Sequence, residues 1–237
     1  MPITLYHDAP PSQTVGNQVL KLVEDNVTDL SMLSVPPSNL LYDIYQWALP
    51  VEVGAYMQRI GAFPNEPVEL LVAFDETNSH EMIGFLLYSP VPSHSEACGI
   101  NYMAVRQSHR RRGIGSELIK TLIARYPHVE LTCTVKKVSF YESLGFQILD
   151  SHSAQVVMNT QSESSPGLMA TLNVAPIYES DEARAIHYRL VQRWGHREMV
   201  KAQKQLARHY AQLERQSRAF VEARLKTTGK VLAQPSL

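Results

Sequence analysis

The stretch Val105-Arg-Gln-Ser-His-Arg-Arg-Arg-Gly-Ile-Gly115 decides how this chain folds. A mostly apolar run, Ala97 to Val105, precedes it, and apolar residues at helical spacing follow it, namely Leu118, Ile119, Leu122 and Ile123. The pattern predicts a strand, a glycine turn and the start of a helix. The first amides of a helix lack intrahelical acceptors and lie at its positive end, so they attract anions. Because Arg110, Arg111 and Arg112 add positive charge, we expect the turn to bind a phosphorylated cofactor.

Two common phosphate-binding loops do not fit this turn. A nucleotide-triphosphatase loop places Lys-Ser/Thr after its second glycine, whereas Gly115 is followed by Ser116 and Glu117. A dinucleotide-binding turn has a third glycine where this chain has Leu118. The sequence Arg110-Arg-Arg-Gly113-Ile-Gly115 instead resembles R/Q-x-x-G-x-G, the acyl-CoA-binding motif of the GNAT acetyltransferase superfamily.

A second motif begins 30 residues after the first. Phe140-Tyr-Glu-Ser-Leu-Gly-Phe146 resembles the F-Y-x-x-x-G-F motif of the same family. The resemblance implies that Tyr141 lies beside the cofactor sulfur and protonates the departing thiolate. Phe140 and Phe146 are expected to pack in the core, and Gly145 is expected to end a short helix.

The resemblance implies an α+β protein with the GNAT fold, in which helices flank a mixed central sheet. Residues 1–160 are expected to form this domain, in the order β-α-α-β-β-β-α-β-α-β. Besides the motif strand, strands are expected at residues 3–7, 68–74, 82–88, 129–135, 146–149 and 155–158. Two helical regions are expected between residues 12 and 61, the second interrupted at Pro50.

The composition changes after Thr160. Residues 161–180 are expected to be a linker, residues 181–226 a basic amphipathic helical extension, and residues 227–237 a flexible tail. The extension has a net charge of +6, whereas residues 1–180 have a net charge of −8. It forms either one helix or a pair broken near Gly195. The apolar side chains along the extension are expected to be buried against another surface, because a helix of this kind is stabilised mainly by packing. That surface is either its own acidic domain or a second copy of the chain, with self-association slightly favoured.

The resemblance implies that an amine attacks the thioester of acetyl-CoA directly, in a ternary complex. The backbone of Met103, Ala104 and Val105 would pair with the pantetheine arm. The amides from Arg110 to Ser116, including that of Ile114, would hold the pyrophosphate. In the family the strand carrying Val105 diverges from its neighbour, here residues 129–135, usually at a bulge.

The general base is harder to assign. Some family members carry a glutamate six residues before the position of Val105, but this chain has Gly99 there. Glu96 is the nearest carboxylate and Glu130 the second choice, while deprotonation through water needs neither. A further departure is that Thr134 and Lys137 stand where many members have Asn and Ala.

Composition narrows the class of protein further. No apolar run approaches the ~20 residues of a membrane helix, and the N-terminus lacks a secretory signal. The spacing of the two cysteines and nine histidines does not suggest metal ligands. We therefore expect a cytoplasmic protein that uses no metal and does not bind a membrane. Nucleic-acid binding by the core domain is not expected, because the CoA phosphates explain Arg110 to Arg112.

Two functions remain open from the sequence. The first is an acetyl-CoA-dependent N-acetyltransferase whose acceptor is a small amine or a protein. The second is a GNAT-fold assembly or binding protein, weakly or non-catalytic, that acts through its basic C-terminal helix. Four aromatic residues (Tyr42, Tyr45, Trp47 and Tyr56) line the acceptor side or belong to the core.

Overall fold

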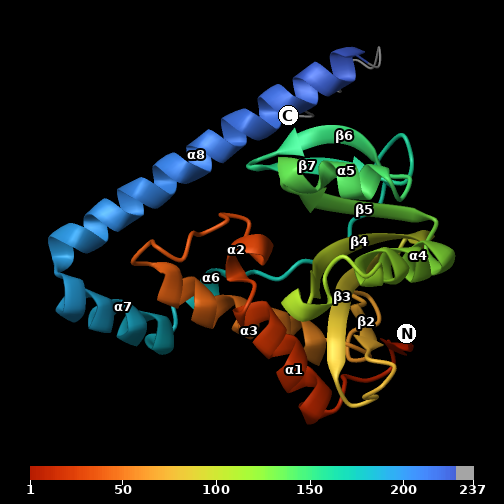
Figure 1. Ribbon diagram of the computed structural model, residues 1–237, viewed down its shortest axis with the longest axis horizontal. Helices are drawn as coiled ribbons and strands as arrows, with labels where there is room; N and C mark the ends of the chain where they lie inside the picture. The colour runs from red at the N-terminus through yellow and green to blue at the C-terminus, as the bar shows by residue number, and fades with distance from the viewer. Residues whose placement is uncertain (228–237) are drawn as a thin grey trace.

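The computed structural model describes residues 1–227, which are built around one seven-stranded mixed sheet (Figure 1). The strand order is β1-β2-β3-β4-β5-β7-β6, and only β4 and β5 are parallel neighbours. The expected α+β architecture is confirmed. The strands are β1 (Ile3–Tyr6), β2 (Glu69–Phe74), β3 (Met82–Val91), β4 (His94–Val105), β5 (His128–Cys133), β6 (Gln147–His152) and β7 (Gln155–Asn159).

Helices cover both faces of this sheet. One face packs on α1 (Gln13–Glu24) and α3 (Tyr42–Gln58), and the other on α4 (Ile114–Arg125) and α5 (Val138–Glu142). Successive residues of β2 therefore enter different cores, because side chains alternate along a strand. Leu71 and Ala73 face α4, whereas Leu70, Val72 and Phe74 face α1 and α3. All ten residues of β3 are buried, as expected for a central strand covered on both sides.

The region between α1 and β2 differs from the expectation at two points. The short helix α2 (Val27–Leu30) follows α1, and the turns before residue 42 delay the start of α3. The prediction that Pro50 interrupts the second helix was wrong, since α3 continues through it. Leu49 and Val53 are buried on either side of Pro50. Their packing offsets the hydrogen bond that a proline cannot donate.

The C-terminal part forms a helical pair. The short helix α6 (Ala175–Tyr178) leads into α7 (Asp181–Trp194) and α8 (His196–Thr227). The Ser180 hydroxyl accepts a hydrogen bond from the Ala183 amide at 3.2 Å and so caps α7. Gly195, at φ +81°, separates the two helices. Of the expected tail, residues 228–237 lie outside the described residues.

Both ends of α8 pack on the rest of the chain. Met199 and Leu206 join a small core with Val35 and Leu41, near the start of α3. Val221 and Leu225 instead enter the main core, where α8 lies against β6 and β7. Figure 1 shows α8 running from α7 to the β6–β7 edge of the sheet. The helix therefore bridges two distant parts of the fold.

Two findings concern residues 1–227 as a whole. No helix in this range is long and apolar enough to cross a membrane. Within the same residues, no group of three or more His, Cys, Asp or Glu side chains is placed to hold a metal ion.

Candidate functional site

The two parallel strands at the centre of the sheet diverge soon after they meet. Pairing between β4 and β5 ends at Gly99 and Glu130. Asn101 is a bulge in β4, because Leu87 pairs with Tyr102 while Tyr88 pairs with Ile100. A cavity of about 540 Å³ lies at this divergence. The divergence and the bulge implied by the family resemblance are thus both present.

The cavity is enclosed by elements from distant parts of the sequence. Its walls come from α2 and α3, from the diverging strands, from α5, and from the segment after β7. The lining residues include Glu52, Tyr56, Asn101, Met103, Tyr141 and Met169.

The glycine turn lies at the end of β4. Gly113, at φ +82°, occupies the N-cap position of α4, and a side chain there would meet no neighbouring atom within 4 Å. A Cβ at position 115 would lie 3.5 Å from the Phe140 ring, so the helix start packs closely on α5. Ile114 is buried and anchors that start. Because the amides of residues 114–116 begin the helix, they lack intrahelical acceptors. The turn is thus open to an anion.

The three arginines of the turn differ in their surroundings. Arg111 and Arg112 are exposed. Arg110 donates to the Val105 carbonyl oxygen at 3.2 Å, donates to Asn26 and lies 3.4 Å from the Asp29 carboxylate. Its guanidinium therefore fastens the turn to the α1–α2 segment, whereas Arg111 and Arg112 are the exposed cationic side chains of this turn.

The stretch from Met103 to Val105 has one paired and one unpaired edge. On one side these residues pair with Leu86, Phe85 and Gly84 of β3. On the other side the pairing with β5 has already ended. An extended molecule can add to such an edge in the way that another strand does. Met103 also lines the cavity, whereas Ala104 packs in the core below it.

Tyr141 of α5 lines the cavity, and its ring is buried in the main hydrophobic core. Its side chain is 6% exposed, and its ring contacts those of Phe140 and Phe146 edge-on, at 5.0 and 5.6 Å between centroids. Gly145, at φ +91°, reverses the chain after α5, so that the Phe146 amide donates to the Tyr141 carbonyl oxygen at 3.1 Å. Burial raises the pKa of Tyr141, and nearby Cys133 adds to the shift. The hydroxyl stays protonated at neutral pH and can donate a proton.

Neither carboxylate proposed from the sequence stands free in the cavity. Glu96 is exposed near the start of β4 and does not line the cavity. Glu130 accepts hydrogen bonds from Asn159, at 3.0 Å, and from Ser164.

The structure brings Glu52 of α3 to the cavity instead. The Tyr102 hydroxyl donates to Glu52 Oε1 at 2.7 Å. Burial raises the pKa of Glu52, while this hydrogen bond opposes the shift. The sequence contains one clue to this residue, since Glu52 is the only acid between Leu49 and Met57 in an otherwise mostly apolar helix.

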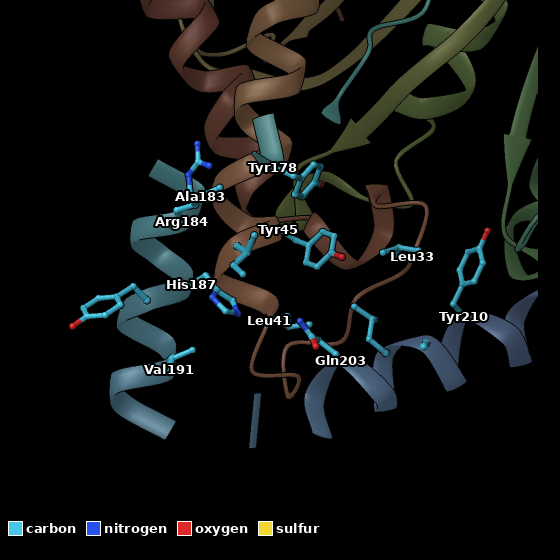
Figure 2. A pocket seen from close by; sticks show the side chains of 14 residues that line it. Leu33, Leu41, Tyr45, Tyr178, Ala183, Arg184, His187, Val191, Gln203 and Tyr210 are labelled. Atoms are coloured by element: carbon cyan, nitrogen blue, oxygen red, sulfur yellow. The ribbon is translucent and has the colours of Figure 1, made fainter. Parts of the chain in front are cut away.

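A second, larger groove of about 820 Å³ lies among α3, α7 and α8, and Figure 2 shows its mostly apolar lining. Tyr45 and Tyr178, with ring centroids 5.7 Å apart, line both this groove and the cavity. Of the four aromatic residues left open by the sequence, Tyr45 and Tyr56 line the cavity, whereas Tyr42 and Trp47 do not.

Comparison with known proteins finds a GNAT acetyltransferase domain within this chain. The family described as "acetyltransferase (GNAT) domain" matches residues 66–148. The PaiA N-acetyltransferase from Thermoplasma acidophilum, in complex with coenzyme A, is 13% identical with a TM-score of 0.52, over 68% of this chain and 99% of that one. A histone acetyltransferase HPA2-related protein from Corynebacterium glutamicum is 21% identical with a TM-score of 0.49, over 73% and 100%. A comparison with curated proteins gave no match.

Proposed function

This chain carries a GNAT acetyltransferase domain, and we propose that it transfers an acetyl group from acetyl-CoA to an amine by direct attack in a ternary complex. One observation carries the proposal. The unpaired edge of β4 and the hydroxyl-bearing Tyr141 lie at the gap between β4 and β5, and the glycine turn beyond β4 lies close to Met103 and Phe140.

The residues around this gap fit coenzyme A. The backbone of residues 103–105 would pair with the pantetheine arm, as one strand pairs with another. The amides of Ile114, Gly115 and Ser116 would hold the pyrophosphate, helped by the exposed Arg111 and Arg112. Arg110 would contribute its amide, because its guanidinium is held by Val105, Asn26 and Asp29.

The chemistry requires a thioester, which acetyl-CoA supplies. As the amine nitrogen bonds to the acetyl carbon, the carbon–sulfur bond breaks and the electron pair stays on sulfur. Tyr141 gives its proton to that sulfur and recovers one from the nitrogen. Holding both reactants side by side removes much of the entropic barrier. The chain's contribution is thus positioning, one proton donor and the anion-binding turn.

A cytoplasmic location and the absence of a metal requirement belong to this proposal. Cys98 and Cys133 are free and buried, which suits a reducing compartment. Fewer observations support the alternative of an assembly protein. They are the apolar groove and the rings of Tyr188 and Trp194, which are 64% and 43% exposed. Turnover distinguishes the two, because an assembly protein needs none.

The proposal is tested at Gly113. Gly113→Asp places a negative charge where the pyrophosphate would bind, and Gly113→Asn is the matched control of equal size and backbone strain. We expect Gly113→Asp to bind CoA ~10²-fold more weakly than Gly113→Asn, about 2–3 kcal/mol, by calorimetry. Equal CoA affinities of the two variants would contradict binding of the pyrophosphate at this turn.

Catalysis is tested in parallel. Labelled acetyl-CoA is incubated with pools of small amines and peptides, and the products are identified by mass spectrometry. Label transfer to any amine supports the enzyme, whereas CoA binding without transfer supports the assembly protein.

A further inference from the structure

We infer that the acceptor is a small cationic amine whose ammonium group is bound by Glu52 and Asn101, inside the cavity that residues 161–174 close. The inference rests on the proposed function, because it concerns the acceptor half of the same cavity. We call residues 161–174 the strap.

Glu52 presents a charged acceptor to the cavity. Its Oε1 already accepts the 2.7 Å hydrogen bond from Tyr102, whose own pKa is raised by burial, so this tyrosine remains a donor. The bond fixes the carboxylate in place and leaves acceptor capacity on its oxygens. A partly buried carboxylate is stabilised most by a cation in contact with it. An ammonium group has the charge and the donors that this side chain lacks.

Asn101 presents a second acceptor at the same cavity. Its Oδ1 is buried, with no hydrogen-bond partner among the described residues. Burial raises the pKa of Tyr56, and hydrogen bonds from the Leu172 amide and the Asn101 side chain oppose that shift. Asn101 itself lines the cavity, so a small rotation of its side chain would bring Oδ1 to a ligand there. An unsatisfied buried acceptor is costly, and an N–H of the ligand would remove that cost.

The remaining surroundings favour a cation. Tyr56 and Tyr102 lie edge to face, with ring centroids 6.3 Å apart, and Tyr45 and Tyr178 close the neighbouring wall. Aromatic faces attract cations once water is excluded. Residues 1–180 also carry a net charge of −8, which raises the local concentration of cations.

The strap limits the size of the acceptor. The Met169 sulfur fills the space where Gly99 has no side chain, and the Leu172 amide donates to the Tyr56 hydroxyl at 3.0 Å. At its other end the Glu163 carbonyl oxygen lies 3.0 Å from His128 Nε2. A polypeptide would have to displace these contacts. The 540 Å³ must also hold the acyl end of the cofactor, which leaves room for a small molecule only.

The same geometry makes Glu52 the proton acceptor for the reaction. The ammonium nitrogen loses two protons in forming an amide. One passes to Glu52 and from there to solvent, and the other replaces the proton that Tyr141 gives to sulfur. The titratable groups facing Glu52 are Tyr56, Tyr102 and Tyr178, and burial raises the pKa of each. Because all three stay protonated at neutral pH, the acid limb of the rate profile should follow Glu52 alone.

The test compares acceptors and variants in the full-length protein. Acetylation of 1,4-diaminobutane and 2-phenylethylamine is measured beside that of peptides with a free N-terminus and an internal lysine. We expect kcat/KM to be at least ~10-fold higher for one of the amines than for any peptide. Glu52→Gln should lower kcat/KM for that amine by ~10²-fold and abolish the acid limb of its pH profile.

Two further variants separate the roles. Asn101→Leu should raise the KM for the amine while leaving the acid limb in place. Glu182→Gln, an exposed carboxylate on α7, makes the same charge change and should leave all parameters unaltered.

The thermal stability of Glu52→Gln shows whether a loss of activity comes from unfolding rather than from loss of the carboxylate. Burial raises the pKa of Glu52, so the folded chain keeps this proton to a higher pH than the unfolded chain does. Its contribution to stability is present below the unfolded pKa and is lost as the pH rises through the folded pKa. Glu52→Gln accepts the Tyr102 hydrogen bond without a charge, so its thermal midpoint at neutral pH should equal or exceed that of the parent.

The outcomes are distinct. Peptide acetylation at the rate of the amines, or a Glu52→Gln variant with parental kcat/KM, would each overturn the inference. Failure to bind CoA, or CoA binding without transfer to any amine or peptide, would instead overturn the proposed function.

Discussion

Replacing Tyr141 with phenylalanine removes one oxygen from the site and little else. The ring is 6% exposed and fixed by edge contacts with Phe140 and Phe146 at 5.0 and 5.6 Å. Phenylalanine keeps these contacts, so the free energy of unfolding should change by no more than about 1 kcal/mol. The change therefore isolates the proton donor from the packing.

The expected effect on the reaction is larger. Because burial raises its pKa, Tyr141 is protonated at neutral pH and can supply a proton to the departing sulfur. Loss of a positioned general acid typically costs 10²- to 10⁴-fold, and we expect the lower end because a thiolate is a fair leaving group. A ~10²-fold fall in kcat corresponds to about 2.7 kcal/mol of transition-state stabilisation.

The assay measures release of the CoA thiol at saturating acetyl-CoA and acceptor, and calorimetry measures the Kd for CoA. Tyr126→Phe is the matched control. Tyr126 donates to Glu69 at 2.9 Å, outside the cavity, so its loss should leave kcat unaltered. We expect Tyr141→Phe to lower kcat with an unchanged Kd. Equal turnover by Tyr141→Phe and the parent would refute the reasoning, and a weaker Kd would mean that Tyr141 binds the cofactor.

Two further predictions concern the C-terminal helices. Leu225 is 5% exposed and packs in the main core, so Leu225→Ala should lower the free energy of unfolding by about 2–5 kcal/mol in chemical denaturation, while Lys226→Ala, at an exposed position, should be neutral. Self-association through residues 181–226 remains a prediction, which light scattering of the full-length protein at high concentration and low salt tests. A monomer under those conditions would leave this region as a packing element of its own domain.

The local part of the fold was predictable from sequence because its determinants are local. The glycine spacing, the apolar series after it and the Phe140–Phe146 motif predicted the strand, turn and helix around position 113. Glycine at positive φ and alternating hydrophobicity act over a few residues, so they are visible in one dimension. The resemblance to GNAT acetyltransferases rested on these same motifs, and the family model that matches residues 66–148 includes both of them.

Three features depended on contacts that the sequence does not display. Pro50 favours a helix break, but burial of its neighbours in a core shared with β2 and β3 holds α3 together. The linker composition of residues 161–174 gave no sign that they contact Gly99 and Tyr56. Nor did the apolar pattern of α8 indicate that Leu225 packs against the main core. In each case the structure of the segment depends on the part of the fold, distant in sequence, against which it packs.

The residues of the candidate site also fall into two groups, those that short motifs predict and those that only tertiary packing brings to the cavity. The sequence by itself pointed to the glycine turn and to Tyr141, the two parts that we propose to bind the pyrophosphate and to protonate the sulfur, because each belongs to a short motif with its own chemistry. Only the tertiary structure brings to the cavity Glu52, the carboxylate that we infer to accept the proton. The sequence pointed to Glu96, the nearest carboxylate on the strand, and to Glu130 on the expected partner strand, whereas Glu52, about fifty residues from Tyr102 in the chain, lies 2.7 Å from its hydroxyl. The protonation of a carboxylate depends on its burial and on the groups facing it, and packing sets both.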